Sequence, residues 1–122
     1  MQILRTFKAR LAAAMLCGFA VVPFALHAQD FPTQPVKLVV PFPPGGTTDI
    51  LARQLATELQ QRWGKPVLVE NRSGASGTIF SEQLAHMPAD GHTLMLTATH
   101  HVINPALYKN LKYDTRADFT PI

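Results

Sequence analysis

Short apolar runs occur three times along the chain, at residues 36–40 (VKLVV), 66–70 (PVLVE) and 93–98 (TLMLTA). The first is rich in β-branched side chains and is bounded by prolines, and the other two have similar length and apolar content. Runs of this kind are typical of strands buried inside a sheet. The sequence therefore predicts three buried strands.

A four-residue repeat of apolar side chains follows the first run. It consists of Leu51, Leu55, Leu59 and Trp63, with Ala52 and Ala56 beside them. This spacing places all six on one face of a helix, which we expect to pack on the core. Gly64 and Pro66 end the helix, and Thr47 or Thr48 is the candidate N-cap.

A shorter helix is outlined after the second run by Ile79, Phe80, Gln83, Leu84 and Met87, and a Pro-Ala-Asp-Gly turn closes it. Strand, helix, strand, helix, strand with short connections predicts an α/β fold, a parallel sheet with flanking helices and right-handed crossovers. Ligands of such sheets bind outside the carboxyl ends of the strands. Here those ends are the loops that begin at Pro41, Asn71 and Thr97.

The first 28 residues have the pattern of an export signal. Arg5, Lys8 and Arg10 give a positive start, residues 11–26 are apolar, and Ala28 supplies a small residue before a cleavage point. We predict a signal peptide over residues 1–28 that is cleaved after Ala28. The alternative is an uncleaved anchor, which the shortness of the apolar stretch disfavours, since about 20 residues are needed to span a bilayer.

Removal of this segment changes the charge balance. The chain has 11 Lys and Arg against 8 Asp and Glu, and three of the basic residues lie in the signal, so the mature segment is neutral. A nucleic-acid partner is excluded because no basic excess remains to meet phosphates. The single cysteine, Cys17, leaves with the signal, which excludes disulfide and thiol chemistry.

The corner at residues 41–48 (PFPPGGTT) lies where a strand-to-helix turn often holds a phosphate. It matches neither the dinucleotide pattern nor the P-loop, because Gly45 and Gly46 are adjacent and no lysine follows them. Backbone amides at a helix N-terminus still favour an anion, and a carboxylate fits there as well as a phosphate. Asp49, in the first helical turn, either complements the helix dipole or accepts a hydrogen bond from a ligand.

Catalytic and metal sites are difficult to build from the remaining residues. The SGASG segment lacks one residue of the G-x-S-x-G elbow. His100 and His101 would face opposite ways on an extended segment, and no spaced set of metal ligands accompanies them. We predict no catalytic residues, no metal and no cofactor.

The loop expected at residues 97–104 offers hydrogen-bonding side chains at the same sheet edge as Gly45 and Gly46. These side chains are Thr97, Thr99, His100 and Asn104. As loop residues, the histidines either line a cleft or simply face solvent. Two polar loops at one edge predict recognition of a small carboxylate without chemistry.

Four motifs stand in order along the chain: PFPPGG-x-TD, VENR, PADG-x-TL and INP-x-LY. With them, residues 31–122 resemble the amino-terminal lobe of the Bug family, the extracytoplasmic receptors of tripartite tricarboxylate transporters. The resemblance implies a periplasmic receptor with a two-lobed type II periplasmic-binding-protein (Venus-flytrap) fold, present here in part. Residues 29–100 would belong to lobe 1, and residues 101–122 would begin the crossover toward a missing lobe 2.

The resemblance also implies ligand contacts, at Phe42, Gly45, Gly46, Thr47, Asp49, Thr97 and Thr99. The implied ligand is a small organic acid (a di- or tricarboxylate, an amino acid or an aromatic acid), and the implied partners are membrane transporter subunits. Two alternatives remain open: a truncated remnant of such a receptor without independent binding, and, less favoured, an exported α/β enzyme.

One segment departs from the family pattern. Where the family reads NRPGAGGNIG, this chain reads NRSGASGTIF, so that Phe80 places a ring where the family has a glycine. Either the second helix packs differently here or the edge of the site is reshaped. The identity of the ligand is therefore left open.

Overall fold

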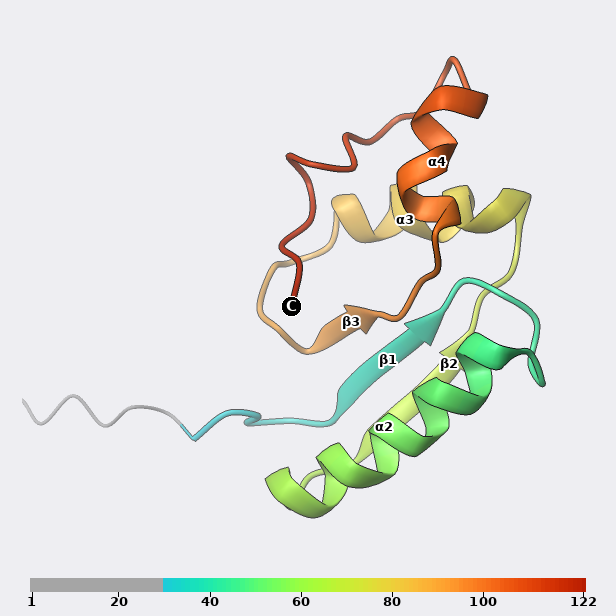
Figure 1. The fold of residues 1–122 in the computed structure, drawn as a ribbon. Helices are drawn as coiled ribbons and strands as arrows, with labels where there is room; N and C mark the ends of the chain where they lie inside the picture. The colour runs from blue at the N-terminus through green and yellow to red at the C-terminus, as the bar shows by residue number, and fades with distance from the viewer. Residues whose placement is uncertain (1–29) are drawn as a thin grey trace, which may run out of the picture.

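A small parallel sheet with helices around it forms the fold of residues 30–122, the residues that the computed structural model describes (Figure 1). The sheet contains β1 (Val36–Val40), β2 (Val67–Asn71) and β3 (Thr93–Met95), in the order β2-β1-β3. The predicted parallel α/β fold is confirmed. The predicted signal peptide and its cleavage point lie outside the described residues.

Strand β1 is the centre of the sheet and pairs in parallel on both sides, with Val36 opposite Val67 and Val39 opposite Met95. Its bounds are those predicted from the sequence, whereas β2 begins and ends one residue later than predicted. β3 is shorter than predicted. After Leu96, whose amide donates to the Val39 carbonyl at 2.9 Å, the chain leaves the sheet.

Helix α2 (Thr47–Trp63) covers one face of the sheet (Figure 1). The buried cluster between them consists of Val36, Leu38, Val40, Ala52, Ala56 and Val67. The prediction that Leu51 and Leu55 face the core is wrong, because these side chains are 53% and 41% exposed. The small alanines form the contact face of the helix, with Leu59 and Trp63 packed partly against the cluster.

The two ends of α2 differ in how well the sequence predicts them. Gly64 ends the helix in the left-handed conformation, with φ of 62°, as its position after Trp63 predicts. The predicted threonine N-cap is wrong. Gly46 is the N-cap, in extended conformation, and its carbonyl accepts the first helical hydrogen bond, from Ile50 at 3.0 Å.

The opposite side of the sheet is covered by η2 (Ala75–Gly77) and α3 (Thr78–Ala85). Successive residues of a strand point to opposite faces, so Val39, which is fully buried, faces this side. Ser81 of α3 donates to the sulfur of Met95 at 3.8 Å. Phe80 is 1% exposed, with the guanidinium of Arg72 5.6 Å from its ring centroid, so its ring is part of the interior.

Helix α4 (His100–Leu107) replaces the loop and the Asn-Pro turn predicted for this region, so that prediction is wrong. Pro105 lies inside the helix and has no N–H to donate to the carbonyl of His101, four residues earlier. The hydroxyl of Thr115 donates to that carbonyl instead, at 3.4 Å. A contact from a later segment thus compensates for the proline.

The chain after α4 folds back over α3 and α4 without regular structure (Figure 1). It is held by an aromatic cluster in which His101 stacks on Tyr113 at 5.8 Å and meets the edge of Phe119 at 4.8 Å between centroids. Within residues 30–122, no helix has both the length and the apolar character needed to cross a membrane.

Candidate functional site

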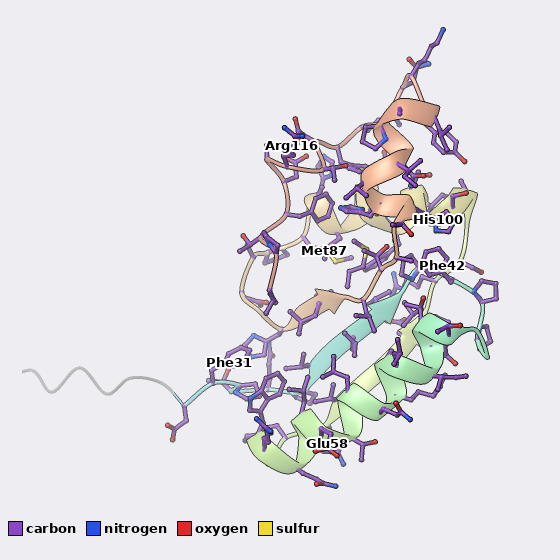
Figure 2. All side chains as sticks on the ribbon, viewed as in Figure 1. Phe31, Phe42, Glu58, Met87, His100 and Arg116 are labelled. Atoms are coloured by element: carbon purple, nitrogen blue, oxygen red, sulfur yellow. The ribbon has the colours of Figure 1, made fainter. Side chains whose placement is uncertain are left out.

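The loops that follow the three strands meet at the carboxyl edge of the sheet. The amide of Arg72 donates to the Val40 carbonyl at 2.9 Å, and Gly77 lies so close to Pro41 that an added Cβ would be 3.2 Å from the proline Cβ. The rings of Phe42 and His100 are 5.5 Å apart, and Figure 2 shows them side by side. The predicted proximity of the first and third loops is therefore present.

The first loop ends at the N-terminus of α2, which no side chain of the described residues caps. Gly45 has φ of 85°, a conformation that glycine adopts readily. Its amide donates to Asp49 Oδ2 at 2.9 Å and is thus already engaged. The amides of Gly46, Thr47 and Thr48 come next, at the positive end of the helix dipole.

Asp49 is 3% exposed and its carboxylate turns back toward the loop. Oδ2 accepts from Gly45 and from Arg53 Nε at 3.1 Å, and Oδ1 accepts from Asn71 Nδ2 at 2.9 Å. The hydrogen bond from Arg53, followed by those from Gly45 and Asn71, lowers the pKa of Asp49 from 3.8 to about 2. With both oxygens engaged by the protein, the geometry favours a structural role for Asp49 over direct contact with a ligand.

Asn71, at the end of β2, is a residue of this corner to which the sequence alone assigned no role in the site, although it belongs to the VENR motif. Besides its bond to Asp49, Nδ2 donates to the carbonyl of Phe42 at 3.2 Å, and Oδ1 accepts from Arg53 at 3.2 Å. The available signals were its place in that motif and a polar residue directly after a predicted strand. Neither signal specifies a partner 22 residues earlier in the chain.

The third loop contributes less than predicted. Thr97 is half-buried after β3, and Thr99 is the exposed N-cap of α4, whose hydroxyl makes no capping hydrogen bond. Asn104 is 1% exposed and donates to the Ser76 carbonyl at 3.1 Å, so its side chain is engaged inside the protein. His100 and His101 diverge, because His101 turns inward and lies 3.4 Å from the hydroxyl of Ser81.

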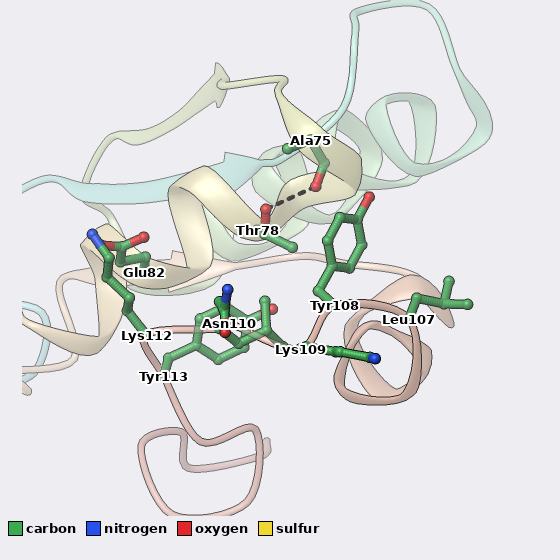
Figure 3. Close-up of a pocket in the computed structure, with 10 residues that line it drawn as sticks. Ala75, Thr78, Glu82, Leu107, Tyr108, Lys109, Asn110, Lys112 and Tyr113 are labelled. Carbon is green, nitrogen blue, oxygen red and sulfur yellow. Dashed lines mark hydrogen bonds and ion pairs between the residues drawn. The ribbon is translucent and has the colours of Figure 1, made fainter.

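A separate pocket of about 370 Å³ lies between α3 and the segment after α4 (Figure 3). Residues 107–113 form one side of it, and Ala75, Thr78 and Glu82 form the other. None of the seven predicted ligand contacts lines this pocket. In the described part of the chain, no three His, Cys, Asp or Glu side chains gather as they would around a metal ion.

Known proteins resemble this chain in sequence and in fold. Protein BugT of Bordetella pertussis is 40% identical over 99 residues, which are 80% of this chain and 30% of that protein. The structure of the periplasmic binding protein BugD matches with a TM-score of 0.71 and 42% identity, over 75% of this chain and 31% of that one. An R. palustris protein solved with adipate matches with a TM-score of 0.72 and 45% identity, over the same shares.

This chain therefore spans about 30% of the length of these relatives. The family model described as tripartite tricarboxylate transporter family receptor, TctC, matches residues 51–122. Its match covers more than half of the chain, and it agrees with the Bug proteins found by sequence and by fold. The resemblance inferred from the four motifs is confirmed, and the chain belongs to the TctC family of tripartite tricarboxylate transporter receptors.

Proposed function

We propose that this chain is part of an exported, periplasmic receptor that captures a small organic carboxylate for a tripartite tricarboxylate-type transporter. Membership of the TctC family supports the receptor class. The similar R. palustris protein solved with adipate, a flexible dicarboxylate, supports the class of ligand. The export pattern of residues 1–28 supports the periplasmic location.

The observation that carries the proposal is the uncapped N-terminus of α2 at the carboxyl edge of the sheet. Amides that no side chain caps attract an anion and have the spacing to donate to a carboxylate. In the proposed complex, the amides of Gly46 and Thr47 bind one carboxylate, and Phe42 forms a wall of the site. Thr97 and Thr99 contact the ligand from the third loop, while Gly45 and Asp49 hold the corner in shape.

The test is isothermal titration of the protein, expressed from its complete gene, with adipate, malate, citrate, aspartate and benzoate. We expect at least one of these acids to bind. Gly46→Leu should weaken that binding at least tenfold, because its side chain would cover the amides. The substitution is compatible with folding, since a Cβ at Gly46 meets only the Pro43 carbonyl, at 3.8 Å.

Gln54→Leu, at an exposed position of α2, is the matched control and should leave the affinity unchanged. Absence of binding by all five acids would count against the receptor proposal. Full affinity in Gly46→Leu would refute the assignment of the corner as the carboxylate site while leaving the receptor function intact.

A further inference from the structure

Asn71 connects three parts of the corner, which lie 29, 22 and 18 residues before it in the sequence. Its side chain donates to the Phe42 carbonyl at the start of the loop and to Asp49 in the first turn of α2. It accepts from Arg53 one turn further along the helix. The beginning and the end of the loop are thereby fixed to one amide group.

That amide group is itself held firmly. Asn71 is the last residue of β2 and lies opposite Val40 in the parallel register. The next amide, that of Arg72, donates to the Val40 carbonyl at 2.9 Å. The side chain therefore extends from a backbone that the sheet fixes, and not from a mobile loop.

The hydrogen bonds also determine how the amide is oriented. Nδ2 has two donors, and both neighbours on its side, the Phe42 carbonyl and the Asp49 carboxylate, are acceptors. Oδ1 faces the guanidinium of Arg53, which can only donate. The reverse orientation would oppose acceptor to acceptor and donor to donor, so one arrangement satisfies the whole group.

This arrangement matters because Asp49 competes with any anion for the end of the helix. A carboxylate in the first turn of a helix is itself stabilised by the N-terminal amides and the dipole. In this structure, Asn71 and Arg53 engage the carboxylate, together with the Gly45 amide. The amides of Gly46 and Thr47 are then available to an external carboxylate.

We propose that Asn71 is a positioning residue for ligand binding: it holds the carboxylate of Asp49 away from the helix end and fixes the loop that presents the amides. This inference rests on the proposed receptor function. Asn71 itself does not touch the ligand. Its contribution is transmitted through Asp49 and through the carbonyl of Phe42.

The test is Asn71→Asp, which has nearly the same shape but replaces the two amide hydrogens with an acceptor. The binding constant is measured with the tightest-binding of adipate, malate, citrate, aspartate and benzoate, at pH 7.5 and at pH 4.5. Each value is divided by that of the unaltered protein at the same pH, which cancels the ionisation of the ligand. Asn110→Asp, at an exposed position outside this hydrogen-bond group, is the matched control for charge.

We expect Asn71→Asp to bind roughly tenfold more weakly at pH 7.5, since a hydrogen bond to a charged group is lost. When two carboxyl groups are adjacent, as Asp49 and the new aspartate side chain would be in Asn71→Asp, repulsion between their charges raises the pKa of one of them. At pH 4.5 the pair therefore takes up a proton, the bond to Asp49 re-forms, and the affinity ratio returns to within about threefold of unity. A loss of general stability would not recover in this way.

A second variant covers the case in which Asn71→Asp does not fold. Asn71→Ser adds no charge, but its shorter side chain cannot reach the partners of the amide group. We therefore expect weaker ligand binding at both pH values. Unchanged affinity in Asn71→Ser, or a deficit in Asn71→Asp that persists at pH 4.5, would overturn the positioning role. Those results differ from failure of the proposed function, in which the unaltered protein binds none of the five acids.

Discussion

Replacement of Phe80 by alanine tests whether this aromatic side chain, which stands where the family pattern has a glycine, stabilises the fold from its interior. The side chain is 1% exposed on α3, and the guanidinium of Arg72 lies 5.6 Å from the ring centroid. Truncation removes the ring from the side of the sheet on which Val39 is buried. Arg72 would lose the aromatic face beside it at the same time.

The expected loss can be estimated from the burial of the ring. A fully buried phenylalanine replaced by alanine lowers the free energy of unfolding by about 3–5 kcal/mol, because apolar contacts are lost and a cavity remains. Small domains have a total stability of roughly 5–15 kcal/mol. Phe80→Ala should therefore leave the protein folded only marginally, or unfolded.

Urea denaturation followed by far-UV circular dichroism measures this loss. Phe31→Ala is the matched control, because it removes the same atoms from a side chain that is 50% exposed. We expect the control to lose about 1–2 kcal/mol, since only part of the ring is removed from water on folding. Equal losses in the two variants, or a loss below about 1 kcal/mol in Phe80→Ala, would refute the conclusion that this ring is part of the interior.

Two further predictions concern Gly77 and His101. Alanine at Gly77 combines φ of 83° with a Cβ 3.2 Å from that of Pro41, whereas alanine at Gly64 has φ of 62° and open space around it. Gly77→Ala should thus lower the free energy of unfolding by more than Gly64→Ala, for which we expect a loss of roughly 1–2 kcal/mol. Urea denaturation measures both losses, and equal losses would contradict close packing of η2 on Pro41. Burial lowers the pKa of His101 from its ordinary 6.5, so its neutral form stabilises the fold above about pH 6.5 and this contribution is lost as the pH falls further. The thermal unfolding midpoint of the unaltered protein should therefore fall more steeply between pH 7.5 and 5.5 than that of His101→Gln. Equal pH dependence of the two midpoints would contradict a stabilising role for neutral His101.

Elements marked by residues with strong local preferences could be predicted from the sequence. β1 lies between two prolines, and α2 ends where Gly64 can adopt a left-handed conformation. α4 could not be predicted, because proline normally disfavours a helix and its compensation comes from Thr115, 14 residues later than His101. The side of α2 that faces the sheet could not be predicted either. The leucines and the alanines have the same helical spacing, and only packing on the sheet selects between them.

The candidate site could be located from the sequence, but its internal contacts could not. Parallel topology places the loops after the strands at one edge, and the proximity of Phe42 to His100 agrees with this. The sequence left two roles open for Asp49. The structural role indicated by the geometry depends on Asn71, which lies 22 residues later, at the end of strand β2. That pairing exists only once the register of the sheet is set.

The charges around the corner bear on how the proposed receptor would attract an anion and still release it. Arg53 lies 3.1 Å from Asp49, and Arg72 lies 2.9 Å from Glu70, so both arginines next to these loops are already paired with carboxylates. At the proposed site, the attraction for a ligand would then come mainly from backbone amides and the helix dipole, which act over a short range and depend on geometry. A site of this kind selects a carboxylate by its shape at the helix end. In the proposed receptor, no strong charge pair would then have to be broken when the ligand leaves, which fits transfer of the ligand to a transporter.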